Sequence, residues 1–127
     1  ADESRKEATN VDSPNDEYYS NKPQPKDFHP YYLCLKEGNI LIGWIQMDTT
    51  YDMLTGELLG WINELYVKKE FRRKGYSKLL MKKALEEFKS NGFQHVGLNV
   101  YYHNKAATRL YKGLGFKDVS KLMKITI

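Results

Sequence analysis

Three stretches in the middle of the chain are rich in β-forming and apolar residues. They cover residues 31–36, 40–48 and 58–68, and the first, Y-Y-L-C-L-K, is an alternating run. Such stretches predict β-strands. The tripeptide E-G-N joins the first two, which favours a hairpin, and residues 49–57 are expected to form a loop before the third strand.

The pattern then changes to helical spacing. Between about residue 76 and residue 90, the apolar residues Leu80, Ala84 and Phe88 recur every four positions. This spacing predicts an amphipathic helix with one apolar face. The dipeptide N-G that follows is a stop signal, so the helix should end there.

A further strand, a second helix and two closing strands are expected after this stop. The strand covers residues 95–100, and Asn104 should cap a helix that runs to about Lys112. Because strand–helix–strand units cross over right-handed, the strands of the unit at residues 60–100 should be parallel. Residues 116–120 and 121–127 predict the closing strands.

The N-terminal part of the chain has a different composition. Residues 1–29 carry almost no aliphatic side chains and contain three prolines among polar residues. We expect a mobile arm or an irregular cover, with a helical turn near residues 16–20. An α/β domain of the α+β type would then occupy residues 30–127, and a chain of 127 residues suits one domain.

Composition adds limits on location. The apolar content of 41% suits a modest core, and no apolar run is long enough to span a membrane or to serve as a signal peptide. The single cysteine, Cys34, excludes an internal disulfide and lies in an alternating run. We therefore expect a buried thiol and a cytoplasmic protein.

The distribution of charge points to a partner. The net charge is +4, but residues 1–30 hold seven acidic and four basic residues, so their net charge is −3 and the remainder carries +7. The basic excess lies mainly between Lys68 and Lys89. Such a patch indicates an anionic partner, or is only a solvated face.

Positive charge is densest in E-F-R-R-K-G-Y-S-K-L-L, between the third predicted strand and the first helix. The first backbone N–H groups of a helix have no helical partner there, and the helix dipole is positive. A glycine lets a phosphate approach the backbone. The turn therefore resembles a pyrophosphate site. It is neither a Walker loop nor a G-x-G-x-x-G fingerprint, and a solvated basic turn is the alternative.

Two segments resemble the GCN5-related N-acetyltransferase (GNAT) superfamily. R-R-K-G-Y-S after L-Y-V-K-K-E-F is similar to motif A, [Q/R]-x-x-G-x-[G/A], with Arg72 first, Gly75 central and Ser77 in place of the final Gly or Ala. N-K-A-A-T-R-L-Y-K-G-L-G-F is similar to N-x-x-A-x-x-[LF]-Y-x-x-x-G-F. The resemblance runs from Tyr31 to the C-terminus, and L-Y-V and L-Y-K-x-L-G are also similar to the polyamine acetyltransferases.

The resemblance implies the GNAT fold and acetyl-CoA as co-substrate. The sheet would be mixed, mostly antiparallel and splayed between two parallel strands, at residues 64–68 and 95–100, with helices on both faces. The pyrophosphate would lie on the backbone of residues 73–78, and the pantetheine arm would run beside the first splayed strand. The cofactor-binding residues would be Leu65, Tyr66, Val67, Arg72, Arg73, Lys74, Gly75, Tyr76, Ser77, Lys78, Asn104, Ala107 and Tyr111.

The implied reaction is direct attack of an amine on the thioester, without a covalent enzyme intermediate. Tyr111 would be the acid and Glu64 the base, with a core tyrosine and a solvent-facing glutamate as the alternatives. Polyamine acetyltransferases place a glutamate one position earlier, where this chain has Asn63. Adjacent strand residues point to opposite faces unless a bulge intervenes, so the base stays open. Tyr66 and Asn99 are further lining candidates.

The acceptor half of the site is less complete than the cofactor half. The family usually begins with a strand and one or two helices that close the substrate side, and here this portion is reduced or missing, so a homodimer partner could supply it. The acceptor would be an amine of a small molecule or a protein. The acidic residues that would favour a polyamine are Asp48, Asp52, Glu57 and Glu64.

Two other functions fit the same residues. A domain of this fold can bind acyl-CoA or a protein partner without catalysis. Alternatively, the basic residues at 68–89, with aromatic residues between them, could follow a nucleic-acid backbone. His29, His95 and His103 lack metal-ligand spacing, so we expect no metal site.

Overall fold

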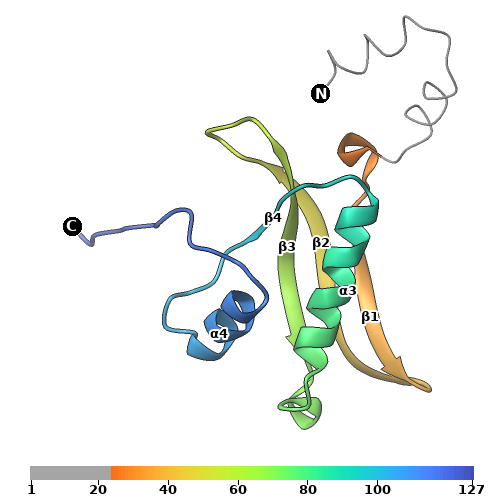
Figure 1. Ribbon diagram of the computed structural model, residues 1–127. Helices are drawn as coiled ribbons and strands as arrows, with labels where there is room; N and C mark the ends of the chain where they lie inside the picture. The colour runs from red at the N-terminus through yellow and green to blue at the C-terminus, as the bar shows by residue number, and fades with distance from the viewer. Residues whose placement is uncertain (1–23) are drawn as a thin grey trace, which may run out of the picture.

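The computed structural model describes residues 24–127, which form a four-stranded sheet with two helices (Figure 1). Strands β1 (Tyr31–Glu37), β2 (Ile40–Tyr51) and β3 (Leu58–Val67) pair antiparallel in chain order, and β4 (Val96–Leu98) joins β3 in parallel. The predicted hairpin and the parallel crossover are confirmed. The expected helical turn near residues 16–20 lies outside the described residues.

Helix α3 (Tyr76–Ser90) supplies one side of the core. Its buried residues face β2 and β3, and they are Leu80, Met81, Ala84 and Phe88. On the sheet, Ile45 and Met47 are fully buried beneath it. A Cβ on Gly60 would lie 2.6 Å from the Phe88 ring, so only glycine allows the helix to approach β3 this closely. The helix ends at the predicted N-G stop.

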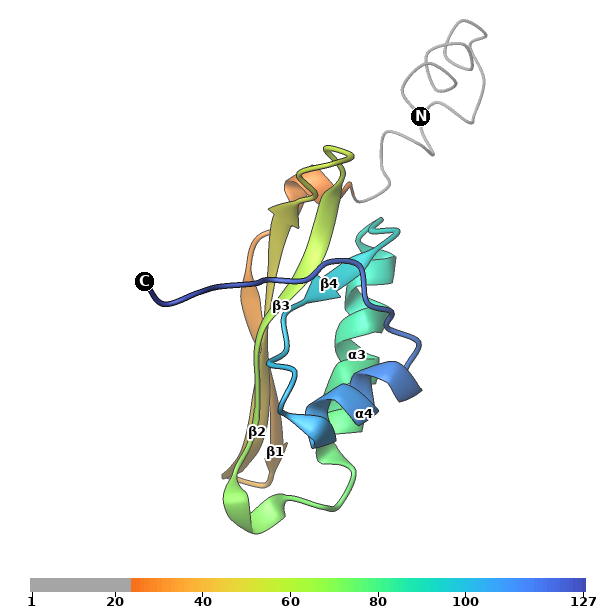
Figure 2. The ribbon, with the colours of Figure 1, turned by 90° about the vertical axis from the view of Figure 1, so that its left-hand side faces the viewer.

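Helix α4 (Lys105–Gly113) begins as the sequence predicts. The side-chain oxygen of Asn104 accepts a hydrogen bond from the Ala107 N–H at 3.1 Å, which is an N-cap. Four partly buried residues of α4 and the following turn pack against the core, namely Leu110, Tyr111, Leu114 and Phe116. In Figure 2, α4 lies on the same side of the sheet as α3. The described residues therefore do not supply the helices that we expected on the opposite face.

Two single-turn 3-10 helices complete the described elements. The first, η1 (Pro25–Asp27), precedes β1, and the second, η2 (Lys69–Phe71), connects β3 to the basic turn before α3. No helix in residues 24–127 has the length and apolar character that a membrane span requires.

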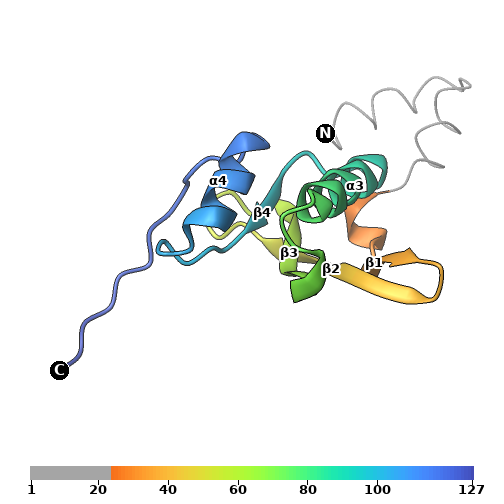
Figure 3. The ribbon, with the colours of Figure 1, turned by 90° about the horizontal axis from the view of Figure 1, so that it is seen from below.

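The predicted closing strands at residues 116–120 and 121–127 are wrong. After α4 the chain runs away from the sheet without strand pairing (Figures 1 and 3), and residues 117–127 are all exposed. The segment has strand-forming residues, with Leu122 94% and Ile125 84% exposed. However, β propensity acts only through pairing and packing, and β4 offers a partner edge of three residues.

Cys34 also differs from the expectation. It is exposed, because it points to the face of β1 opposite α3, whereas Leu33 and Leu35 on either side are partly buried against the core. The alternating run predicted the strand correctly. It assigned the thiol to the wrong face, since alternation alone does not say which face is covered.

Candidate active site

The basic turn has an unusual backbone that opens it to solvent. Arg73 has φ 66° and Gly75 has φ 84°, both in the left-handed region. Gly75 is the N-cap residue of α3, and a Cβ placed there would meet no atom within 4 Å. The positive φ therefore favours glycine at this position, and crowding does not, since the space beside the residue is free.

The N-terminus of α3 presents unpaired donors. The Gly75 carbonyl accepts the Leu79 N–H at 3.1 Å, which is the first helical bond. Within residues 24–127, the N–H groups of Tyr76, Ser77 and Lys78 have no acceptor, no side chain caps the helix, and the first turn has no acidic residue. Free N–H groups at the positive end of a 15-residue helix are suited to bind an anion.

Arg72 is directed toward the end of β3. Its Nε donates to the Val67 carbonyl at 2.8 Å, and its guanidinium carbon lies 5.4 Å from the centre of the Tyr66 ring. Lys74 lies over the Phe71 ring at 5.9 Å, and all four basic residues, Arg72, Arg73, Lys74 and Lys78, are exposed. Among these basic side chains, Arg72 is therefore the one that is hydrogen-bonded to strand β3.

Strands β3 and β4 separate after a short paired region. Their register pairs Gly60 with Val96 and Trp61 with Gly97, and it ends where Ile62 meets Leu98. Beyond this point β3 continues to Val67 and pairs only with β2. The splay expected between the parallel strands is confirmed, and the edge of residues 63–67 that faces away from β2 is open. The expected strand at residues 95–100 is shorter, because only residues 96–98 are paired.

A β-bulge lies at the start of the splay. Gln46 pairs with Glu64 and Met47 pairs with Ile62, so Asn63 is the extra residue. Glu64 accepts a hydrogen bond from the Trp44 indole N–H at 2.7 Å. Whether Asn63, Glu64 or both can reach a site on the face of Trp44 therefore depends on where the Asn63 side chain points.

Asn63 points to the same face as Glu64. Its amide donates to Asp48 Oδ2 at 2.9 Å, and Asp48 and Trp44 both alternate in β2 with the buried Ile45 and Met47. Both exposed side chains therefore lie opposite α3. A regular strand would have separated them, and the bulge brings them together.

The remaining acidic candidates for an acceptor site have other partners. Glu57 lies 2.7 Å from His95 Nδ1, and Asp52 accepts the Leu54 N–H at 2.8 Å within its own loop. The structure therefore places Asp48 near Glu64, through Asn63, and gives Asp52 and Glu57 local roles. In the part of the chain that the structure covers, no three His, Cys, Asp or Glu residues are grouped as metal ligands.

Tyr111 is half-buried on α4. Its ring centre lies 5.9 Å from that of Phe116, and burial raises the pKa of its phenol. The hydroxyl has no hydrogen-bond partner in residues 24–127. The phenol therefore stays protonated at neutral pH and has a proton to donate, although its raised pKa does not make it a stronger acid.

Asn104 has one side-chain polar group engaged, and within residues 24–127 the other has no partner. Its oxygen is used by the cap, which leaves the side-chain NH₂ to donate to a ligand. Ala107, whose N–H completes that cap, lies one turn into the same helix.

Sequence reasoning missed one residue of this site. Neither of the two sequence motifs includes Trp44, and the structure bonds it to Glu64. The sequence does predict that strands β2 and β3, which a loop joins, lie side by side. The register that brings residues 44 and 64 together depends on the bulge, which the sequence does not reveal.

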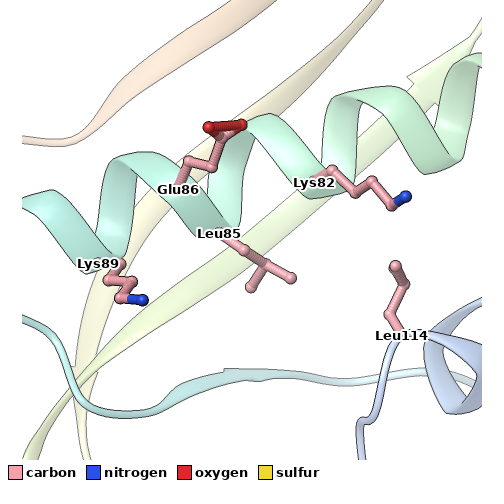
Figure 4. Close-up of a pocket in the computed structure, with 5 residues that line it drawn as sticks. All are labelled: Lys82, Leu85, Glu86, Lys89 and Leu114. Atoms are coloured by element: carbon pink, nitrogen blue, oxygen red, sulfur yellow. The ribbon is translucent and has the colours of Figure 1, made fainter.

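A separate pocket lies away from these residues. Its volume is about 430 Å³, and it opens between α3 and the end of α4, as Figure 4 shows. It is lined by Lys82, Leu85, Glu86, Lys89 and Leu114. None of the predicted site residues lines it, and its lysines and glutamate are exposed, so the chemistry described above does not use it.

Known proteins share both the sequence pattern and the fold. Thialysine N-epsilon-acetyltransferase of Sus scrofa is 28% identical over 103 residues, which are 73% of this chain and 60% of that protein. GCN5-related N-acetyltransferase 4, chloroplastic, of Arabidopsis thaliana is 34% identical over 95 residues, which are 68% of this chain and 32% of that protein. The chain thus spans less than two thirds of the length of these relatives.

Solved structures and a family model complete the comparison. A candidate acetyl transferase from Pyrococcus furiosus has a TM-score of 0.71 and 25% identity, over 80% of this chain and 68% of that one. Aminoglycoside N-acetyltransferase AAC(6')-Iy in complex with CoA has a TM-score of 0.67 and 16% identity, over 78% of this chain and 67% of that one, and shows the same fold. The model of the acetyltransferase (GNAT) family matches residues 2–116, so the chain belongs to that family.

Proposed function

We propose that the protein transfers an acetyl group from acetyl-CoA to a primary amine of a small molecule or a protein. One observation carries the proposal: the open edge of β3 leads directly into a helix N-terminus with unpaired N–H groups, and the bulge at the start of this edge presents Glu64. An extended thioester with a pyrophosphate at one end fits such an edge followed by an anion site.

The cofactor would lie along β3 with its pyrophosphate on the turn. The N–H groups of residues 73–78 would bind the phosphates, with Arg73, Lys74 and Lys78 adding charge. The backbone of residues 65–67 would pair with the pantetheine arm. Asn104 would donate to the arm through its free NH₂, and Ala107 and Tyr111 would line the α4 side.

The chemical step would need one base and one acid. An amine is mostly protonated near neutral pH, so Glu64 would accept its proton before attack. The new C–N bond would form at the carbonyl carbon, the C–S bond would break, and the departing thiolate would take a proton from Tyr111. The attacking nitrogen would then give its second proton to the Tyr111 phenolate, which restores the phenol and leaves the neutral amide. Much of the acceleration would come from holding the two substrates together.

The supporting relatives leave the acceptor as the least defined part. The similar proteins are named for different amine substrates, thialysine and aminoglycosides among them. A polyamine-like acceptor near Asp48, a cytoplasmic location and a homodimer stay predictions. A GNAT-fold domain that binds acyl-CoA without turnover is the alternative, and it would show cofactor binding with no transfer to any amine.

A calorimetric titration of acetyl-CoA tests the cofactor site. Tyr76→Pro removes one N–H of the helix N-terminus at a position where proline suits the helix, and Tyr76→Ala is the matched control that keeps the N–H. We expect micromolar binding by the wild type and the alanine variant, and binding weaker by about 10- to 150-fold in the proline variant, because a hydrogen bond to a charged group contributes about 1.5–3 kcal/mol.

The opposite outcome is equally clear. A folded chain that binds no acetyl-CoA at millimolar concentration would refute the proposal. If the same chain bound oligonucleotides with strong salt dependence, the basic patch would be a nucleic-acid surface instead.

A further inference from the structure

A continuous series of contacts joins Glu64 to the basic turn. The indole N–H of Trp44 donates to Glu64 at 2.7 Å, and the Trp44 ring lies 4.8 Å from the Tyr66 ring at an interplanar angle of 32°. Arg72 covers Tyr66 at 5.4 Å and donates to the Val67 carbonyl at 2.8 Å. The series therefore runs from the proposed base to Arg72, which directly precedes the proposed phosphate site at residues 73–78.

We propose that Trp44 is a positioning residue for Glu64, and that the stack of Trp44, Tyr66 and Arg72 couples the carboxylate to the cofactor turn. Binding of the pyrophosphate would order Arg72, and the stack would transmit this order to the base. This inference rests on the proposed function, since it gives Trp44 a role in the same reaction.

The Trp44 indole restricts the position of the Glu64 carboxylate. Its side chain is exposed, and within the described chain its one hydrogen-bond partner is the Trp44 indole. An exposed glutamate without a partner samples several rotamers. The indole bonds Oε1 and leaves Oε2 to accept a proton from an amine.

Trp44 makes two kinds of contact, a hydrogen bond to Glu64 and a ring contact with Tyr66. Among apolar side chains, tryptophan combines a large flat surface with an N–H donor, so it can stack and donate at once. Phenylalanine could replace the stacking on Tyr66 but not the hydrogen bond. This difference makes Trp44→Phe a selective substitution.

Arg72 connects the aromatic stack to the basic turn. A planar guanidinium can stack on Tyr66 while it donates to Val67, and its other N–H groups are left for an anionic ligand. Lysine keeps the charge but can neither stack in this way nor donate from two sides. Arg72→Lys therefore separates the charge of the turn from its connection to the stack.

Indole NMR signals test the coupling without any need for activity. The chain has two tryptophans, Trp44 and Trp61, so its ¹H–¹⁵N spectrum should show two indole signals, and Trp44→Phe identifies which is which. We expect Glu64→Ala to shift the Trp44 signal, and CoA to shift the Trp44 signal more than the Trp61 signal. In Arg72→Lys, the CoA-induced shift of Trp44 should be lost at CoA concentrations that calorimetry shows to be saturating.

Two spectral outcomes would overturn the inference. A Trp44 signal that ignores Glu64→Ala would mean that the hydrogen bond does not exist in solution. A CoA-induced shift that is unchanged in saturated Arg72→Lys would mean that the stack does not carry the coupling.

Kinetics with an amine acceptor separate this inference from the proposed function. Trp44→Phe should lower kcat by about tenfold, a part of the 10²–10⁴-fold that a general base contributes, while the KM for acetyl-CoA stays within about twofold. Trp61→Phe is the matched control and should keep wild-type kcat. If Glu64→Gln kept full activity, the base assignment itself would fail. If Glu64→Gln were inactive and Trp44→Phe fully active, only the positioning role would fail.

Discussion

Asn63 has no cross-strand partner in β2, and this single insertion changes the chemistry that β3 can present. In a regular strand, Asn63 and Glu64 would point to opposite faces of the sheet, so only one of them could lie on the face of Trp44 and Asp48. The side chains of residues 63 and 64 are thus both available on the face opposite α3. A bulge can therefore preserve access to an active site when the position of a carboxylate shifts by one residue.

Tyr111→Phe tests the proposed acid. Removal of the hydroxyl should lower kcat by about 10²-fold and leave the affinity for acetyl-CoA unchanged, because the ring and its packing remain. Burial raises the pKa of Tyr111, so the wild-type phenol stays protonated through neutral pH, and the wild-type activity should fall only at alkaline pH, as this phenol ionises. A pH–rate profile compared with the variant's would show this, and equal rates in both proteins would remove Tyr111 from the mechanism.

Tyr31 gives a pH dependence of stability. Its hydroxyl donates to Glu87 at 2.6 Å, and burial, this hydrogen bond and the Glu87 charge raise its pKa to about 12. A group with a raised folded-state pKa stabilises fully below its unfolded value of about 10, and the contribution is lost as pH rises toward the folded value. Urea denaturation between about pH 9 and pH 12 should therefore show a steeper loss of stability in the wild type than in Tyr31→Phe. Parallel curves for the two proteins would contradict this.

At the scale of elements, the contact between α3 and β3 depends on the absence of one side chain. Gly60→Ala would place a Cβ 2.6 Å from the Phe88 ring, so the helix or the ring must move. We expect a loss of about 1–3 kcal/mol in the free energy of unfolding by urea titration. Phe88→Leu in the same chain should relieve the clash, so the double variant should lose less stability than the two single losses added together. A loss equal to or larger than that sum would show that the clash is elsewhere.

Helix α4 allows the two roles of Asn104 to be separated. Asn104→Asp keeps an oxygen for the Ala107 N–H but loses the NH₂ donor, so stability should hold while acetyl-CoA binds more weakly. Asn104→Ala loses both groups and should also cost about 1 kcal/mol of stability. Thermal melts with calorimetry on both variants would measure the two effects, and unchanged affinity in Asn104→Asp would exclude contact with the cofactor.

At the scale of the whole molecule, the C-terminal tail, residues 117–127, contributes no packing to the core. Residues 119–127 are exposed, and their removal leaves the ion pair between Lys112 and Asp118 in place. The shortened protein should melt within about 2 °C of the full chain, since a change of 1 kcal/mol would shift Tm by about 4–8 °C in a domain of this size. A larger decrease would mean that the tail packs on the sheet in solution.

The sequence predicted the elements that depend on local patterns and missed the features that depend on distant partners. Local periodicity predicted α3, α4 and the three long strands, because an amphipathic pattern needs only one covered face. It failed for Cys34 and for the tail, where the result depends on which edge or face has a partner. The bond between Trp44 and Glu64 spans twenty residues and depends on a bulge, which no local pattern reveals.

The open edge of β3 has a practical consequence for handling the protein. Unpaired strand edges recruit other extended chains, and proteins usually protect them with bulges or charges. Here Asn63 and Glu64 protect only the start of residues 63–67, so the remainder is shielded when an extended ligand occupies it. Purification and storage with coenzyme A should therefore keep the sample monodisperse longer than buffer alone, and light scattering over days would record the difference.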